Sequence, residues 1–163
     1  MKHNLIACGG TFDLLHKGHK EFLKYVLVLS DKVIIGLTSD EYVSRHKPNK
    51  NIASFVIRKI NLINFLKEIR AQKRIEIVKI DDTFGPLLNS KFNADGLAVT
   101  PQLRKIAENI NTQRIDRGLK PLKILEVSQV KADDRKVISS SRIRKGEIDR
   151  EGKLRVVRKK HKV

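Results

Sequence analysis

Two hydrophobic patterns alternate along the chain, and they predict strands and helices in turn. Short apolar runs are typical of strands buried on both faces of a parallel sheet, and they occur at residues 5–8, 33–37 and 97–99. Spaced apolar residues predict two further strands at 75–80 and 124–130. Apolar residues recur with helical spacing at residues 19–29, 54–70 and 103–110. Ser54 is a suitable N-cap, and Gly118 and Pro121 end the last helix. Residues 38–50 are polar and predict a loop.

This order of elements predicts an α/β fold: a single doubly wound, five-stranded parallel sheet with helices on both faces. No internal repeat or low-complexity linker divides it, so we expect one domain over 1–150 and a basic C-terminal tail over 151–163. In such sheets ligands bind beyond the carboxyl ends of the strands, where the strand order reverses. Residues 9–19, residues 38–47 and Thr100 all fall on that edge.

The net charge of +17 raises the question of a nucleic-acid partner. Part of the excess lies in the tail, in cations that stand without acidic neighbours: Lys153, Arg155, Arg158, Lys159, Lys160 and Lys162. The tail has no aromatic side chain on which a base could stack. We therefore expect the charge to serve solubility and anionic small molecules, and we expect no specific nucleic acid as a partner.

Several classes of protein are disfavoured by the composition. The single cysteine, Cys8, fits a reducing cytoplasm, and the apolar run after Met1 is too short for a signal peptide. No run is long enough to span a membrane. A zinc site formed by Cys8, His16 and His19 lacks a fourth ligand, and the chain has no P-loop motif. We expect a cytoplasmic protein with no membrane contact and no metal held by protein ligands.

The stretch of residues 9–19 follows the first predicted strand and carries the strongest chemical signal. Gly9 and Gly10 allow the backbone to approach a ligand closely, and Gly18 does the same at the mouth of the next helix. His16 and His19 are three residues apart, at the first turn of a helix that begins near residue 17. Free N–H groups and the positive end of the helix dipole favour an anion there.

A second candidate phosphate site occupies residues 137–144, after the fifth predicted strand. Three hydroxyl residues at a helix start, Ser139, Ser140 and Ser141, supply an N-cap and further donors. Arg142 can grip a phosphate with two hydrogen bonds. An ordinary capped helix would explain the same residues when they are considered alone.

A cationic segment, residues 45–50, follows the second predicted strand. It contains Arg45, His46, Lys47 and Lys50, which suit an incoming phosphate. A mobile surface loop would have the same composition, and the sequence leaves both interpretations open.

The string GGTFDLLHKGH at residues 9–19 resembles the signature of the HxGH nucleotidyltransferases, and ISSSR at 138–142 resembles the second signature of that superfamily. Four further stretches narrow the resemblance: residues 36–41, 82–86, 110–114 and 139–149. Together they are similar to the archaeal and eukaryotic type of phosphopantetheine adenylyltransferase, over residues 5 to about 150.

The resemblance implies a Rossmann-like nucleotidyltransferase fold and a reaction late in coenzyme A biosynthesis. Adenylyl would pass from ATP to 4′-phosphopantetheine, giving dephospho-coenzyme A and pyrophosphate. Mg²⁺ would act as the cofactor that neutralises part of the triphosphate charge. The phosphate of the acceptor is the nucleophile, so positioning and charge stabilisation would carry the catalysis.

The resemblance also assigns roles to individual residues. The catalytic residues would be His19, Thr11 and Lys47, with His19 a donor to the α-phosphate and Lys47 a clamp on the attacking phosphate. ATP would be bound by Gly9, Gly10, Thr11, Phe12, His16, Gly18, His19, Ser139, Ser140, Ser141 and Arg142. The acceptor would be bound by Thr11, Lys47, Asp82 and Arg114.

Two alternatives remain at this stage. Another nucleotidyltransferase of the same superfamily would carry the same phosphate motifs while acting on a flavin or an alcohol phosphate. A basic nucleic-acid-binding module on an inactive nucleotide fold would account for the tail, although the intact His16, His19 and residues 139–142 argue against it. We expect a monomer or a small homo-oligomer.

Overall fold

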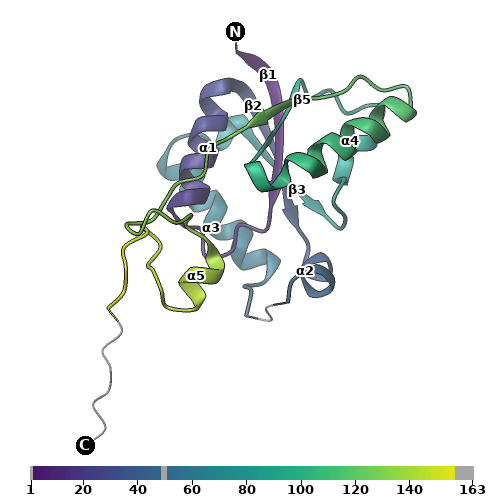
Figure 1. Ribbon diagram of the computed structural model, residues 1–163. Helices are drawn as coiled ribbons and strands as arrows, with labels where there is room; N and C mark the ends of the chain where they lie inside the picture. The colour runs from purple at the N-terminus through teal and green to yellow at the C-terminus, as the bar shows by residue number, and fades with distance from the viewer. Residues whose placement is uncertain (1, 49–50, 157–163) are drawn as a thin grey trace, which may run out of the picture.

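The computed structural model describes residues 2–48 and 51–156 (Figure 1). The strands are β1 (His3–Gly10), β2 (Ser30–Thr38), β3 (Ile75–Ile80), β4 (Gly96–Val99) and β5 (Lys123–Glu126). The helices are α1 (Lys17–Leu29), α2 (Asp40–His46), α3 (Phe55–Glu68), α4 (Arg104–Asp116) and α5 (Ser140–Arg144). Short 3₁₀ turns occupy Gln72–Arg74, Gly85–Leu88 and Pro101–Leu103.

The strands form one five-stranded sheet in the order β3-β2-β1-β4-β5, and every pairing is parallel. This confirms the predicted α/β class. β1 lies at the centre, and the chain fills one side of it with β2 and β3 before it crosses to β4 and β5 on the other. The strand order therefore reverses between β1 and β4, which is where such sheets bind ligands.

Two apolar layers cover the faces of the sheet (Figure 1). On one face α1 and α3 pack against side chains that include Ile6, Ile35 and Leu37. On the other face α4 packs against Ala7, Leu97 and Val99. Successive residues of β1, Ile6 and Ala7, thus point into different layers, as the two-residue period of a strand requires. A strand buried on both faces needs the continuous apolar run that predicted it.

A third, smaller cluster holds the C-terminal part of the chain. Ala132, Ile138 and Ile148 form its buried centre. Residues 151–155, expected to lie in the tail, take part in this region: Asp133 N–H donates to the carbonyl of Gly152, and Arg155 N–H donates to that of Glu147. Of the tail cations, Arg158, Lys159, Lys160 and Lys162 lie outside the described residues.

The largest differences from the predicted elements are at α2, β2 and β5. The predicted loop after β2 is in fact the short helix α2, whose N-cap Ser39 accepts a hydrogen bond from Tyr42 N–H. Only Val43 of this helix is buried, so it shows little hydrophobic periodicity. β2 begins at Ser30 because Ser30 and Lys32 pair with β1, whereas β5 ends at Glu126 instead of residue 130.

Candidate active site

Two pockets open at the carboxyl ends of the central strands and share the wall formed by Gly9, Gly10 and Thr11. Ala98, Val99 and Leu103 also line both. Because β1 and β4 are the strands between which the order reverses, the shared wall stands at the predicted switch point.

The first pocket, named here the histidine pocket, brings the two sequence motifs together. From residues 9–19 it takes Gly9, Gly10, Thr11, Phe12, His16, Gly18 and His19, and from the second motif Ile138, Ser139 and Ser140. Residues 128–130, which follow β5, close its far side. Two strings separated by more than a hundred residues in the sequence thus line one cavity.

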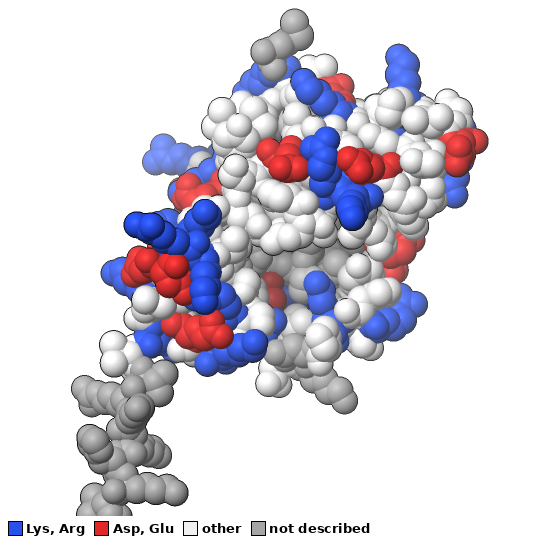
Figure 2. All heavy atoms as spheres, in the orientation of Figure 1, with Lys and Arg blue, Asp and Glu red and all other residues white. Residues whose placement is uncertain are grey.

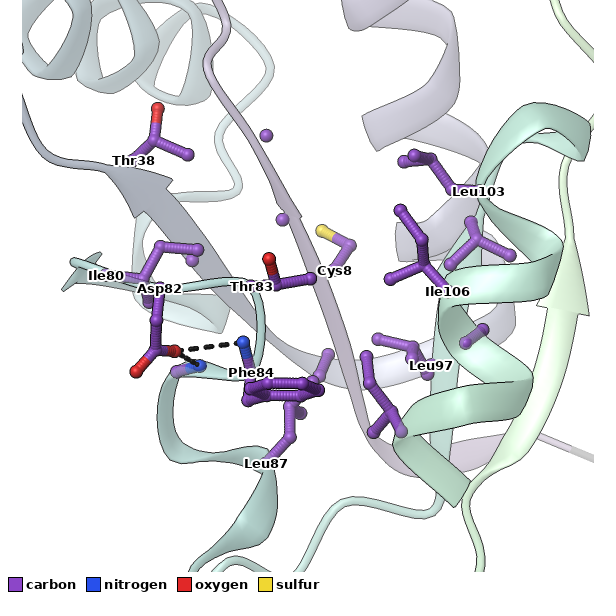
Figure 3. Close-up of a pocket in the computed structure, with 18 of the residues that line it drawn as sticks. Cys8, Thr38, Ile80, Asp82, Thr83, Phe84, Leu87, Leu97, Leu103 and Ile106 are labelled. Atoms are coloured by element: carbon purple, nitrogen blue, oxygen red, sulfur yellow. Dashed lines mark hydrogen bonds between the residues drawn. The ribbon is translucent and has the colours of Figure 1, made fainter. Parts of the chain in front are cut away.

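The second pocket, named here the apolar pocket, lies on the other side of the shared wall (Figure 3). Leu103 and Ile106 project into it from the side of α4, and Phe84 and Leu87 project from the opposite loop. Polar groups are few in its lining and include Thr38, Lys47 and Asp82. Such a cavity suits a largely apolar ligand that carries a polar or charged end.

The two histidines form a reciprocal cap at the start of α1. Nδ1 of His16 accepts from the backbone N–H of His19 at 3.4 Å, and Nδ1 of His19 accepts from that of His16 at 3.3 Å. Their rings stack with centroids 3.7 Å apart. Gly18 is required for this stack, since a Cβ there would lie 2.9 Å from Cε1 of His16. The space that a side chain at position 18 would need is therefore occupied by the His16 ring, so Gly18 makes room for this ring.

This geometry fixes the protonation of both rings. A backbone N–H can only donate, so each Nδ1 is unprotonated and each neutral ring carries its proton on Nε2. Burial, with a smaller contribution from the charge of Arg150, lowers the pKa of His16 to about 4. Burial, with a smaller contribution from His16, lowers the pKa of His19 to about 3. Both histidines are neutral Nε2–H donors at neutral pH.

We expect neither ring to gain a proton as the pH falls from 8 to 5. The folded pKa values lie below the ordinary histidine value, so the unfolded chain takes up protons first. The stability that the neutral pair contributes is fully present above about pH 6.5 and is lost as the pH falls through about 4 and then 3. NMR titration of the imidazole Cε1–H signals measures this directly, and a midpoint near 6.5 for both residues would contradict it.

The loop between β1 and α1 is held in a strained form. Phe12 and Leu14 have φ of +50° and +58°, in the left-handed region that residues with a Cβ avoid. Such residues persist where surrounding contacts impose them. Here Phe12 is buried, and its ring lies 5.2 Å from that of His19. The strain is stored beside the shared wall of the two pockets.

Asp13 joins the first motif to the second. Its side chain is buried, and its Oδ2 accepts from NH1 of Arg144 at 2.6 Å. Its backbone carbonyl accepts from the hydroxyl of Ser140 at 2.7 Å. Its Oδ1 accepts from Ala53 N–H, ahead of α3. The strained loop is thus fastened to α5 and to the start of α3.

The structure brings most of the predicted ATP residues together but leaves two outside the histidine pocket. Ser141 is exposed and is not part of the lining. Arg142 is held by ion pairs with Asp134 and Glu147 and by a hydrogen bond to the carbonyl of Val137. Ser139 caps α5 by accepting from Arg142 N–H.

Three of the four predicted acceptor residues line the apolar pocket: Thr11, Lys47 and Asp82. Oδ1 of Asp82 accepts from the N–H groups of Phe84 and Gly85, which fixes the loop between β3 and the next turn (Figure 3). Arg114 lies outside the lining, buried in α4, where it donates to the carbonyls of Leu87 and Lys120. Of the cationic segment, Asn49 and Lys50 are outside the described residues.

Sequence reasoning missed three charged residues that hold the site together: Asp13, Arg58 and Arg144. Arg58 is 1% exposed and contacts the ends of β1 and β2. Their partners are distant in the sequence, so no local pattern shows them. One signal was present, because Arg58 is a charged residue on a helix of predominantly apolar sequence.

Two negative findings bear on the kind of site. Within residues 2–48 and 51–156, no group of three or more His, Cys, Asp or Glu side chains is arranged to hold a metal ion. In the same part of the chain, no helix has both the length and the apolarity needed to cross a bilayer. Burial raises the pKa of Cys8 to about 12, so its thiol is protonated although it borders the apolar pocket.

Comparison with known proteins agrees with this geometry. The profile of the cytidylyltransferase-like family matches residues 7–146. The phosphopantetheine adenylyltransferase of Methanosarcina mazei is 39% identical over 153 residues, which cover 92% of this chain and 96% of that protein. The protein of the same name from Methanopyrus kandleri is 39% identical over 144 residues, covering 88% and 90%.

A solved structure shares the fold. A protein of unknown function from Archaeoglobus fulgidus superposes with a TM-score of 0.67 at 30% identity, over 85% of this chain and all of that one. The sequence matches, which run over almost the full length of the relatives, include both motifs that line the histidine pocket. The chain therefore belongs to the cytidylyltransferase-like family and, within it, to the phosphopantetheine adenylyltransferases.

Proposed function

We propose that this chain transfers adenylyl from ATP to 4′-phosphopantetheine, giving dephospho-coenzyme A and pyrophosphate, a step of coenzyme A biosynthesis. The observation that carries the proposal is the pair of pockets that meet at Gly9, Gly10 and Thr11. The histidine pocket would hold ATP, since both phosphate motifs line it. The apolar pocket would hold the pantetheine arm, and its polar end would bring the acceptor phosphate to the shared wall.

In this arrangement the reaction needs no protein nucleophile. An oxygen of the acceptor phosphate attacks the α-phosphorus of ATP and forms a new P–O bond. The bond from that phosphorus to the bridging oxygen breaks, and pyrophosphate leaves with the electron pair. The protein's contribution is to align the two phosphates and to stabilise the charge that builds on the α-phosphate.

His19 and His16 would serve as neutral donors. Each ring presents its Nε2–H, because each Nδ1 is occupied by a backbone N–H. A neutral imidazole can donate its Nε2–H to a phosphate oxygen without first gaining a proton, so the reaction would not depend on a histidine titration near neutral pH. We assign the α-phosphate to His19 and the triphosphate more generally to His16.

Thr11 would orient the attacking phosphate. Its Oγ1 accepts from the hydroxyl of Thr38 at 3.0 Å, which leaves its own proton free to donate. The exposed ammonium of Lys47 borders the apolar pocket and would clamp the same phosphate. Ser139 and Ser140 would lie along the triphosphate, whereas contacts from Ser141 and Arg142 to ATP, and from Arg114 to the acceptor, remain predictions. Arg142 would have to leave Asp134 and Glu147 to make such a contact.

Mg²⁺ fits as an ion that arrives on ATP. The described residues offer no cluster of ligands for it, and Mg²⁺ commonly keeps its waters and binds through substrate phosphates. It would neutralise part of the triphosphate charge.

The assay that tests the proposal measures pyrophosphate release from ATP and 4′-phosphopantetheine. We expect turnover with this pair and much less with CTP in place of ATP. Flavin mononucleotide and glycerol 3-phosphate serve as acceptor controls, since neither has the long arm that the apolar pocket would hold. Turnover only with CTP, or only with one of these other acceptors, would contradict the proposed function.

The charge pattern on the face drawn in Figure 2 favours small anions over a polynucleotide as the partner. Lysine, arginine and acidic side chains alternate over the face drawn in Figure 2, and no continuous basic stripe crosses the described residues of that face. A hollow near the middle of the face is bordered by both signs of charge. Tight duplex binding would need cations arrayed along one track.

A further inference from the structure

A buried arginine that lies outside both pocket linings ties the ends of β1 and β2 together. Arg58 stands in the first turn of α3, and its side chain is among the largest that are fully buried. A guanidinium group has five N–H donors, and every one of them is used here. They reach Ala53 O (2.8 Å), Thr11 O (2.9 Å), Thr38 Oγ1 (3.4 Å), Thr38 O (2.9 Å) and Asp40 Oδ1 (3.2 Å).

Burying an arginine here costs more free energy of desolvation than burying an apolar side chain would. A guanidinium group loses its water on burial, and the carboxylate that faces it, Asp40, is itself 55% exposed. An apolar side chain of similar volume would fill the same space without that desolvation. What the arginine provides and an apolar residue cannot is a rigid fork that fixes several oxygen atoms relative to one another.

One branch of the fork reaches the hydroxyl of Thr11. Arg58 NH1 donates to Oγ1 of Thr38, and the hydroxyl of Thr38 donates to Oγ1 of Thr11. Since Thr11 accepts in this chain, its own proton is free to donate to another group, and Thr11 lines both pockets. Each bond polarises the next, so the positive charge of Arg58 strengthens Thr11 as a donor.

The other branches anchor the chain on both sides of Lys47. Asp40 begins α2, the helix that precedes Lys47, and Lys47 N–H donates to Val43 O at its end. Ala53 comes after Lys47, and its carbonyl accepts from Arg58 while its N–H donates to Asp13. The segment that carries the proposed phosphate clamp is thus fixed to the same guanidinium as the phosphate-orienting loop.

We propose that Arg58 is a positioning residue for the acceptor phosphate: it directs the Thr11 hydroxyl through Thr38 and holds the Lys47 segment in register with it. The inference rests on the proposed function. It goes beyond that function in separating the two substrates. Thr11 lines both pockets, but Thr38 and Lys47, through which Arg58 acts, line only the apolar pocket.

The test compares Arg58→Lys and Thr38→Val with the wild-type chain. Lysine keeps the charge but has three donors that radiate from one nitrogen, so it cannot hold all of the oxygens. We expect kcat/KM for phosphopantetheine to fall roughly 10²-fold in Arg58→Lys, the size of effect that a small misplacement produces. Thr38→Val cuts only the hydroxyl chain and should lower it by about 10-fold. ATP affinity, measured by calorimetry, should stay close to wild type in both.

Arg74→Lys is the matched control. Arg74 grips the carbonyls of Leu27, Ser30 and Asp31 at the opposite end of β2, far from the pockets. Its replacement removes similar bonds and should lower the thermal midpoint, but it should leave kcat/KM for the acceptor unchanged. An equal kinetic loss in Arg74→Lys would show that general destabilisation is the cause and would overturn the inference.

The double variant Arg58→Lys/Thr38→Val separates a shared chain from two independent effects. If Arg58 acts on Thr11 through Thr38, the double variant should be no worse than Arg58→Lys alone, whereas independent effects would multiply. Multiplied losses, or a loss of ATP affinity as large as the loss in acceptor kinetics, would refute the positioning role. Thr38→Val decides the kinetic question by itself if Arg58→Lys does not fold.

A measurement on the ligand-free chain tests this inference even if the proposed function is wrong. Wild-type protein that is inactive with phosphopantetheine would contradict the proposed function. Amide hydrogen exchange would still test the positioning: Arg58→Lys should speed exchange at Ala53 and Phe55, whose N–H groups bond to Asp13 and Asp40, and Arg74→Lys should not. Unchanged exchange in Arg58→Lys would overturn the inference.

Discussion

Replacing His19 with alanine is expected to lower kcat about 10²- to 10³-fold, with a much smaller change in KM for ATP. The neutral Nε2–H of His19 would donate to the α-phosphate as negative charge builds on it, and removal of one such donor typically costs this much. An interaction that is made chiefly in the transition state appears in kcat. Steady-state kinetics of pyrophosphate release measures both parameters.

The control for this variant must separate chemistry from folding. Nδ1 of His19 also caps α1, so His19→Ala should lower the thermal midpoint by a few degrees. His3→Ala removes a histidine at the opposite end of β1 and should leave kcat unchanged. A folded His19→Ala protein with near-normal kcat would show that the HxGH motif has another role here.

The centre of the sheet was predictable because its strands are largely buried on both faces there. Burial forces a continuous apolar run, and the runs in β1 and β2 are plain in the sequence. β3 lies at the edge of the sheet and was predicted from spaced apolar residues, Ile75, Ile77, Val78 and Ile80. α2 was missed because the features that form it are polar: the Ser39 cap, acidic residues in its first turn and basic ones in its last. Such features specify a short helix but give no apolar stripe, so a polar loop was the simpler interpretation.

In the candidate site, too, some residues could be predicted from local sequence and others could not. Gly9, Gly10, His16 and His19 could be named from the sequence because a local string carries their geometry. The ion pair of Asp13 and Arg144 joins residues 131 positions apart, and Arg58 reaches Thr11 across 47. Those contacts exist only after the sheet brings the strand ends together. Sequence reasoning therefore named most of the residues that line the two pockets and missed the charged residues that hold them in place.

Replacing Asp13 with asparagine is expected to destabilise the fold by about 3 to 5 kcal/mol, the usual loss when one partner of a buried ion pair is removed. Oδ1 accepts from Ala53 N–H and Oδ2 from Arg144, so the new NH₂ group would face a donor in either orientation. Arg144, whose Nε already has no hydrogen-bond partner, would keep an uncompensated charge in a largely buried position. The thermal midpoint should fall by roughly 10 °C.

Two further variants show whether the lost charge pair is the cause. Asp31→Asn breaks the exposed pair with Lys2 and should cost no more than about 1 kcal/mol, because water screens that pair. In Asp13→Asn/Arg144→Met the stranded charge is gone, so the double variant should be more stable than Asp13→Asn alone. Thermal and urea unfolding measure all three. If Asp13→Asn melted as Asp31→Asn does, the buried pair would not be what fastens the first motif to the second.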